Sequence, residues 1–194
     1  MIGYWAGLKM LIPLSFRNVH LNYLKRNGVL RRNGIFRRQG NVLEIGSGTG
    51  RLLYLMRWRG WNVFGIEPST NAADFANNTL EVPTINNFVE NVNLGRQFDL
   101  VMMLGVLEHT ADPIGILKKI KPWLRKGGKL YISVPRLKPH LRHGILAAPH
   151  LFMFNTKTIS MALDRADFMV EHMDLTEDTI YLICSLEDGG RVEG

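Results

Sequence analysis

The chain has 194 residues, 46% hydrophobic and 21% charged, which suits one folded domain and excludes a disordered chain. Its 24 Lys and Arg against 17 Asp and Glu give a formal charge of +7. Its one cysteine excludes an internal disulfide and a Cys-cluster zinc site, and favours a reducing, cytoplasmic setting. The apolar stretch 1–16 is too short to cross a bilayer and has no cleavage-site pattern, so we expect no secretory signal.

The positive charge is concentrated in two blocks. Residues 1–43 hold eight Lys and Arg and no acid, and residues 113–163 hold ten and no acid. Residues 44–112, between the two blocks, hold four bases and eight acids. Such blocks indicate either a solvated face or an anionic partner.

From residue 41 onward, short β-rich runs alternate with helical patterns, which predicts a parallel sheet with helices on its faces. The expected strands are 41–45, 62–66, 84–85, 98–104, 129–134, 168–175 and 179–185, the last two pairing as a hairpin. The expected helices are 49–58, 70–77, 113–126 and 156–165.

The third of these helices has clear signals at both ends. Asp112 is a good N-cap, Pro113 suits the first helical position, and the Gly127-Gly128 pair predicts the end. Lys121, Arg125 and Lys126 would then stabilise the helix dipole from the last turns. The connection 135–150 that follows is long for a compact domain, which favours a functional lid.

A glycine-rich loop follows the first strand. Gly46, Gly48 and Gly50 allow a sharp turn and direct contact between a ligand and the backbone, at the start of a helix. Glu44 precedes the loop, where it would repel a pyrophosphate but attract an ammonium or sulfonium group. Glu67 ends the second strand at the sheet edge where α/β proteins bind ligands, and can accept ribose hydroxyls.

With these motifs in order, the chain resembles class I S-adenosylmethionine-dependent methyltransferases of the small-molecule type, and around Glu108-His109 it resembles the ubiquinone-pathway group closely. The resembling pieces are the glycine loop, Glu67, Phe98-Asp99-Leu100-Val101, Leu107 to Pro113, Leu124 to Leu130, and Ile132-Ser133-Val134-Pro135. The resemblance implies a doubly wound, Rossmann-like α/β fold with seven strands in the order 3-2-1-4-5-7-6 and strand 7 antiparallel. It also implies S-adenosyl-L-methionine as cofactor and S-adenosyl-L-homocysteine as product.

The resemblance also implies which residues bind the cofactor. The glycine loop would hold its methionine end, Glu67 the ribose, Glu90 or Asn91 the adenine edge, and Leu104-Gly105 a backbone contact beside it. The complete expected set is Glu44, Gly46, Ser47, Gly48, Gly50, Glu67, Pro68, Glu90, Asn91, Leu104 and Gly105.

The chain departs from the family in two places. Ala166-Asp167 stands where the family has a glycine that ends the last helix, and Asp tolerates the left-handed conformation needed there. The ubiquinone-pathway group has a metal-associated acid three residues before the Glu of its Glu-His pair, where this chain has Gly105.

His109 is the expected catalytic base, with Glu108 beside it, because both follow the fourth strand at the ligand edge. The alternative is that the pair only shapes the loop before the next helix. Basic residues of the long connection are expected to contact an acceptor carrying phosphate or carboxylate groups: Arg136, His140, Arg142, His143 and His150. These histidines have no carboxylate near in sequence, so we expect no metal.

We expect residues 41–186 to form the methyltransferase domain, with a basic helical segment at 1–40 and a tail at 187–194. The bases and aromatics of residues 1–38 suit either a helix packed over the site or peripheral contact with an anionic membrane. Nucleic acid is less favoured, since no recognition motif accompanies the charge.

The sequence therefore predicts methyl transfer to a small-molecule or lipid-like acceptor. The alternatives are a non-catalytic cofactor-binding partner subunit and an RNA methyltransferase. A dehydrogenase fits the glycine spacing and Glu44 poorly.

Overall fold

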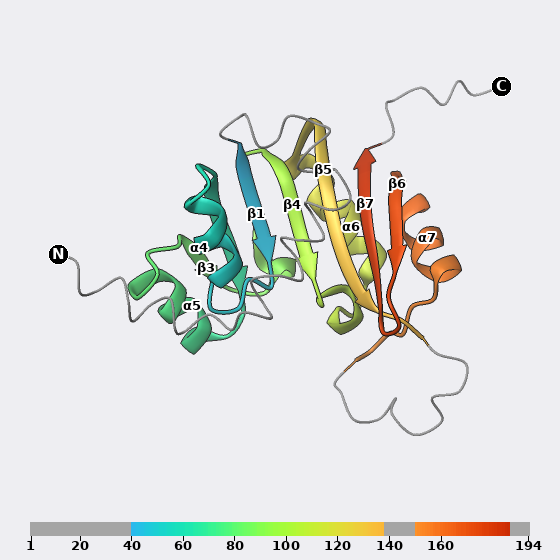
Figure 1. Ribbon diagram of the computed structural model, residues 1–194, viewed down its shortest axis with the longest axis horizontal. Helices are drawn as coiled ribbons and strands as arrows, with labels where there is room; N and C mark the ends of the chain where they lie inside the picture. Colours follow the sequence, from blue (N-terminus) through green and yellow to red (C-terminus); the bar gives the residue numbers. More distant parts are fainter. Residues whose placement is uncertain (1–39, 138–149, 187–194) are drawn as a thin grey trace.

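The computed structural model describes residues 40–137 and 150–186, which form a single seven-stranded sheet flanked by helices (Figure 1). The strand order is β3-β2-β1-β4-β5-β7-β6, as predicted. The strands are β1 (Asn41–Ile45), β2 (Asn62–Glu67), β3 (Thr84–Asn86), β4 (Phe98–Leu104), β5 (Leu124–Pro135), β6 (Phe168–Leu175) and β7 (Thr179–Leu186).

Strands β1 to β5 pair in parallel, so their carboxyl ends meet at one edge of the sheet. Strand β7 runs antiparallel to both β5 and β6, which confirms the predicted closing hairpin. The central strands β1 and β4 are buried almost throughout, because helices cover both faces of the sheet. The fold therefore brings the ends of β1, β2, β4 and β5 together at one edge.

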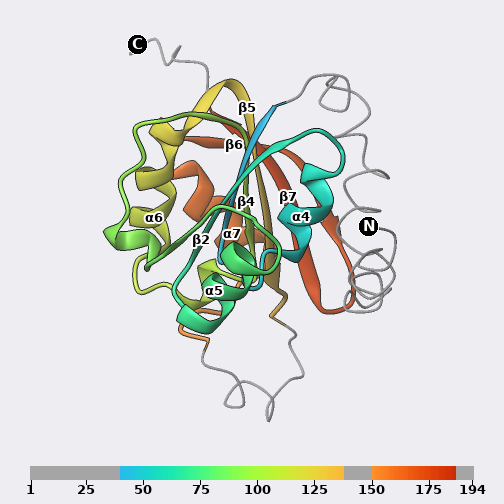
Figure 2. The ribbon, with the colours of Figure 1, turned by 90° about the vertical axis from the view of Figure 1, so that its left-hand side faces the viewer.

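Two apolar cores lie on opposite faces of the sheet. One face packs against α4 (Arg51–Arg57) and α5 (Thr70–Asn78), through residues such as Leu53 and Ala76. The other packs against α6 (Pro113–Ile120) and α7 (Thr156–Asp164), through residues such as Leu117 and Leu163. Figure 2 shows α4 on one side of the sheet and α6 and α7 on the other. Three short 3-10 turns complete the described elements: η1 (Val89–Asn91), η2 (Leu107–His109) and η3 (Lys121–Trp123).

The predicted end of the helix after Asp112 was wrong. The helix stops at Ile120 and β5 already begins at Leu124, because Pro122 has no N–H to continue the helical hydrogen bonds. Arg125 therefore lies on the strand, where it pairs with Asp99 at 3.3 Å, and cannot act on the helix dipole. The start was predicted correctly: the Asp112 carboxylate accepts a hydrogen bond of 2.8 Å from the backbone N–H of Gly115.

The last helix also begins and ends as the sequence indicated. Asn155 and Thr158 form a reciprocal capping box at its start. After its end, Asp167 adopts the left-handed conformation with φ 57°, in the place where the family has glycine.

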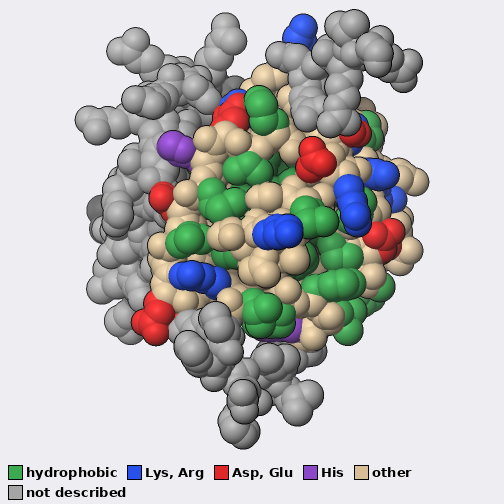
Figure 3. Space-filling model, turned by 90° about the vertical axis from the view of Figure 1, so that its right-hand side faces the viewer, with side chains coloured by type: hydrophobic (Ala, Val, Ile, Leu, Met, Phe, Trp, Pro, Cys, Tyr) green, Lys and Arg blue, Asp and Glu red, His purple; other side chains and the backbone are tan. Residues whose placement is uncertain are grey.

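Beside this helix, β6 forms an edge of the sheet with Met169 and Leu175 about half exposed. Figure 3 shows this side of the molecule, where hydrophobic and charged side chains alternate. No helix within residues 40–137 and 150–186 is long and apolar enough to cross a bilayer. The basic segment 1–38 and the tail 187–194, with their predicted roles, lie outside the described residues.

Candidate active site

Two neighbouring cavities open at the carboxyl edge of the parallel strands. The larger, of about 450 Å³, lies over the ends of β1, β4 and β5 and reaches β7. The smaller, of about 300 Å³, lies between the end of β2, η1 and η2. Gly46 and Gly105 line both cavities, so the two spaces adjoin at these residues. A ligand that contacts Gly46 and Gly105 can therefore reach both.

The glycine loop turns through conformations that favour glycine. Gly46, Gly48 and Gly50 have φ of 69°, 53° and 72°, in the left-handed region. A Cβ on Gly46 would lie 2.6 Å from the Val106 side chain, whereas one on Gly48 would meet nothing within 4 Å. The space at Gly48 belongs to the larger cavity, so a ligand can reach the backbone there.

Glu67 is fixed between the loop and the following helix. Its Oε2 accepts a hydrogen bond of 2.8 Å from the Gly48 N–H, and its Oε1 accepts one of 2.9 Å from the Ser69 N–H. The residue is 8% exposed and lines the smaller cavity. Each carboxylate oxygen keeps a further lone pair, so the predicted acceptance of two ribose hydroxyls is compatible with these bonds.

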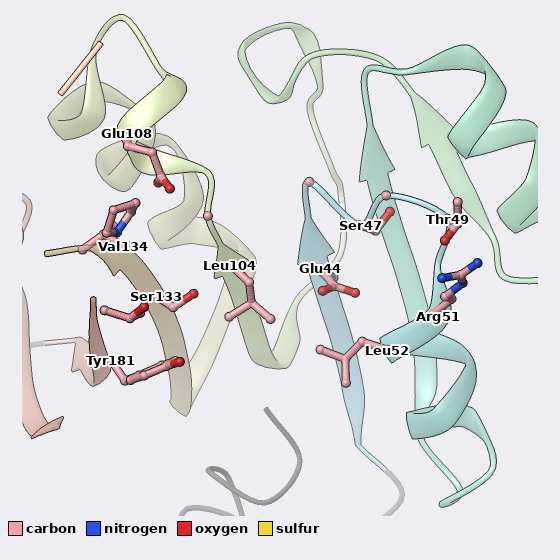
Figure 4. Close-up of a pocket in the computed structure, with 15 residues that line it drawn as sticks. Glu44, Ser47, Thr49, Arg51, Leu52, Leu104, Glu108, Ser133, Val134 and Tyr181 are labelled. Carbon is pink, nitrogen blue, oxygen red and sulfur yellow. The ribbon is translucent and has the colours of Figure 1, made fainter. Parts of the chain in front are cut away.

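Glu44 lies at the end of β1, buried to 4% exposure, and lines the larger cavity. Burial, together with the charge of Glu67, raises the pKa of Glu44 from 4.5 to about 8. Its Oε2 and the hydroxyl oxygen of neighbouring Ser47 have no hydrogen-bond partner among the described residues. Figure 4 shows Glu44 at the end of β1 and Ser47 on the loop that follows it, among the residues that line this cavity.

Glu108 and His109 form the turn η2, immediately after β4. Glu108 is 2% exposed and lines the larger cavity, where Figure 4 shows its carboxylate directed toward the open space. Burial raises its pKa, while a backbone hydrogen bond and the neighbouring His109 act in the opposite direction. His109 lines the smaller cavity. The pair thus lies at the junction of the two spaces, as required of groups that act on a ligand.

Comparison with known proteins identifies the family. Residues 17–173 match the family described as Methyltransferase domain. The chain belongs to this methyltransferase family. The match spans most of the chain and confirms the resemblance found in the sequence.

Two curated relatives of this chain are named for different reactions. A ubiquinone biosynthesis O-methyltransferase of Actinobacillus pleuropneumoniae serotype 7 is 33% identical over 130 residues, 61% of this chain and 56% of the relative. A tRNA U34 carboxymethyltransferase of Alteromonas mediterranea is 33% identical over 108 residues, 48% of this chain and 32% of the relative. The chain thus spans only about a third to a little over half of the length of these two curated relatives.

Solved structures share the fold. A Burkholderia thailandensis 1,6-didemethyltoxoflavin-N1-methyltransferase, solved with 1,6-didemethyltoxoflavin and S-adenosylhomocysteine, has a TM-score of 0.65. The two proteins are 19% identical, and the likeness covers 82% of this chain and 76% of that one. At this identity the likeness concerns the architecture.

The residues expected to bind the cofactor lie around both cavities, with two exceptions. Pro68 and Glu90 line the smaller cavity together with Glu67, and Leu104 lines the larger one. Gly50 lies beyond the cavity linings and packs its Cα against α5, since a Cβ there would meet Ala76 at 2.9 Å. Asn91 hydrogen-bonds within its own turn, to Asn87 at 3.3 Å. Of the adenine alternatives, the geometry therefore favours Glu90.

The expected acceptor residues fall partly outside the described ranges, which do not contain His140, Arg142 or His143. Arg136 donates a hydrogen bond of 3.3 Å to the Thr176 carbonyl, so its side chain lies at the turn between β6 and β7. His150 lies beside His109, with 4.8 Å between ring centroids. No acid is near His150 in the sequence, but in the fold the carboxylate of Glu108 lies close to it.

Several cavity residues were missed by the sequence reasoning. Ser133 and Tyr181 are direct cross-strand neighbours on β5 and β7 and face the larger cavity together (Figure 4). Successive side chains of a strand point to opposite faces of the sheet, so the alternation of each residue with its core neighbours could have indicated that both point to the same face. The others are Thr49, Arg51, Leu52, Val134, Pro135 and Thr179 in the larger cavity, and Ile45, Ile66, Phe88, Val89, Val106 and Thr110 in the smaller one.

Proposed function

We propose that the protein transfers the methyl group of S-adenosylmethionine to a small-molecule or lipid-like acceptor. The observation that carries the proposal is that three buried polar atoms without a hydrogen-bond partner belong to residues lining one cavity. Glu44 Oε2, Ser47 Oγ and Glu108 Oε2 all belong to residues that line the larger cavity. A buried polar atom without a partner costs about 1–3 kcal/mol, so three beside one cavity favour a ligand with cationic and hydrogen-bonding groups.

The cofactor would extend across the junction of the two cavities. Its adenosine would occupy the smaller one, with the ribose hydroxyls on Glu67 and the adenine near Glu90 and the exposed ring of Phe88. Its methionine end would occupy the larger one, with the ammonium group beside Glu44. The sulfonium would then lie near Gly46 and Gly105, where the absence of side chains leaves the methyl group accessible.

The acceptor would enter the part of the larger cavity bounded by Leu104, Ser133 and Tyr181. Its nucleophilic atom attacks the methyl carbon in line with the carbon–sulfur bond, whose electron pair passes to sulfur and gives neutral S-adenosylhomocysteine. Because the donor is already activated, alignment is the main requirement, and it can lower the barrier by roughly 7–11 kcal/mol. Where the acceptor is a hydroxyl, we propose that its proton passes to His109, with Glu108 beside it.

Binding calorimetry and a methylation assay test this proposal together. We expect S-adenosylmethionine and S-adenosylhomocysteine to bind and NAD not to bind. We expect Glu67→Gln to weaken both cofactors at least tenfold, since hydrogen bonds to a charged group contribute about 1.5–3 kcal/mol. Asp74→Asn on α5 removes an acid outside the cavity linings and is the matched control. Binding of NAD without S-adenosylmethionine would refute the proposal.

Transfer of a radioactive methyl group identifies the acceptor class. Small-molecule acceptors of the ubiquinone pathway, which the name of one relative suggests, are compared with bulk tRNA in parallel reactions. We place small molecules first, because the ubiquinone relative is matched over the longer stretch. Label in tRNA alone would favour the RNA alternative. Cofactor binding with no transfer to any acceptor would favour the non-catalytic partner subunit.

A further inference from the structure

Three side chains from two distant parts of the chain meet beside the active site. Glu108 and His109 come from η2, and His150 comes from the segment that leads to α7. One ligand atom of each, a carboxylate oxygen or a ring nitrogen, lies within 4.8 Å of the other two. The two imidazole rings meet edge to face at 63°.

Backbone hydrogen bonds hold this arrangement together. The Glu108 carbonyl oxygen accepts one bond of 2.7 Å from the Leu151 N–H and another of 3.1 Å from the Phe152 N–H. The two residues after His150 are therefore tied to the backbone of Glu108 itself. A third backbone bond, from the His109 N–H to the Val106 carbonyl at 2.9 Å, closes the η2 turn. The grouping of the three side chains thus follows from how the backbone is anchored.

The carboxylate of the group is buried and incompletely satisfied. Glu108 is 2% exposed, and its Oε2 has no hydrogen-bond partner among the described residues. A buried carboxylate is stable only when paired with a cation or hydrogen-bond donors. A cation bound between Glu108 and the two imidazoles would provide that pairing, which favours a binding role for all three.

We propose that Glu108, His109 and His150 bind one divalent transition-metal ion. Two imidazoles and one carboxylate are typical ligands of Zn²⁺ and related ions, whereas Mg²⁺ and Ca²⁺ prefer oxygen ligands. Metal–ligand bonds of about 2.1 Å place neighbouring ligand atoms about 3.0–3.4 Å apart. The observed limit of 4.8 Å therefore requires the side chains to close by only about 1–2 Å on binding.

Three protein ligands leave coordination positions open, and Glu108 lines the larger cavity, so an oxygen of the acceptor can reach such a position. The inference therefore deepens the proposed function and rests on it for the identity of the neighbouring ligand. A bound ion would have His109 as a ligand and would lower the pKa of the acceptor hydroxyl. Without one, His109 is the base.

Metal binding is measured directly on the chelator-treated full chain. We expect one equivalent of Zn²⁺ to bind in calorimetry, and Co²⁺ to give the visible absorption of a site with nitrogen ligands. We expect His150→Ala and Glu108→Gln each to weaken Zn²⁺ binding at least tenfold. His172→Ala, on β6 and outside the group, is the matched histidine control and should bind Zn²⁺ as the wild type does.

Thermal unfolding separates loss of the site from loss of the fold. His150→Ala should melt like the wild type without metal but lose the increase that Zn²⁺ gives the wild type. Failure of the wild type to bind Zn²⁺ and Co²⁺, or equal binding by His150→Ala and wild type, would overturn the metal site. Cofactor binding by the metal-free chain is measured separately, so the proposed methyltransferase function can survive that result or fail on its own.

Discussion

Glu44 makes binding of S-adenosylmethionine depend on pH in a predictable direction. The free protein holds this buried carboxyl with a pKa of about 8, so it is mostly protonated at neutral pH. An ammonium group beside it would favour the charged form and ionise it on binding. Binding below pH 8 therefore releases a proton, and raising the pH strengthens it.

The magnitude follows from the pKa of the free protein. If Glu44 is fully ionised in the complex, the affinity at pH 6.0 is about ninefold lower than at pH 7.0. About 0.9 proton is released for each cofactor bound at pH 7.0. Ionising the carboxyl at that pH costs about 1.4 kcal/mol, which the contact with the ammonium must exceed.

Calorimetric titration in two buffers of different ionisation enthalpy measures both the affinity and the number of protons released. Glu44→Gln is the control, because the amide keeps an acceptor oxygen but cannot ionise. Other acids near the cofactor, Glu67 and Glu108 among them, are unchanged in this variant. The difference between the two proteins therefore isolates Glu44. Equal proton release by wild type and variant, or wild-type affinities that match at pH 6.0 and 7.0, would refute the reasoning.

Three further predictions concern stability and the loop. Glu44→Gln should raise the melting temperature of the free protein at pH 8. In the wild type the raised pKa of Glu44 means that the folded protein is fully stable below pH 4.5 and loses stability as the pH rises toward 8, where the buried carboxyl ionises. Glutamine cannot ionise, so the variant avoids this loss. Gly48→Ala should lower the free energy of unfolding by about 1–2 kcal/mol and weaken cofactor binding at least tenfold. Gly46→Ala should lower the free energy of unfolding further, because its Cβ would clash with the Val106 side chain. Equal melting temperatures of the two variants would contradict this. In urea unfolding, Asp167→Ala should be about 1 kcal/mol less stable than Asp167→Gly, since both lose the same surface ion pair and only alanine is strained at φ 57°.

The sheet and the glycine loop could be predicted from the sequence because their signals are local. The residues Phe98–Leu104 form an apolar run interrupted only by Asp99, which is typical of a strand buried on both faces, and the structure has this strand with the same bounds. The positions of Glu44 and Glu67 follow from the loop and the end of a parallel strand, so both were expected at the ligand edge. Asn155 likewise marks its helix through a hydrogen bond to a residue only three positions away.

The errors and omissions came from competing or long-range signals. The Gly127-Gly128 pair resembles a helix end, but Pro122 acts earlier in the chain, and β5 incorporates both glycines. His150 has no acid near it in sequence, and only the bonds to the Glu108 carbonyl bring it beside one. Ser133 and Tyr181 become neighbours through the β5–β7 register, which the composition of neither strand specifies.

The acids of the site also explain why the middle of a basic chain is acidic. Burial opposes ionisation of Glu44, and the nearby charge of Glu67 adds to this effect. A fold selected for stability alone would replace such groups with apolar ones, because unpaired buried charges are unfavourable. Their combination at two adjoining cavities therefore favours a cationic ligand, and the proton released on binding measures how far that ligand pairs with Glu44. An analogue of S-adenosylmethionine without the amino group should bind without releasing a proton from Glu44. The proton release by Glu44 therefore tests whether the ammonium group lies beside this carboxyl.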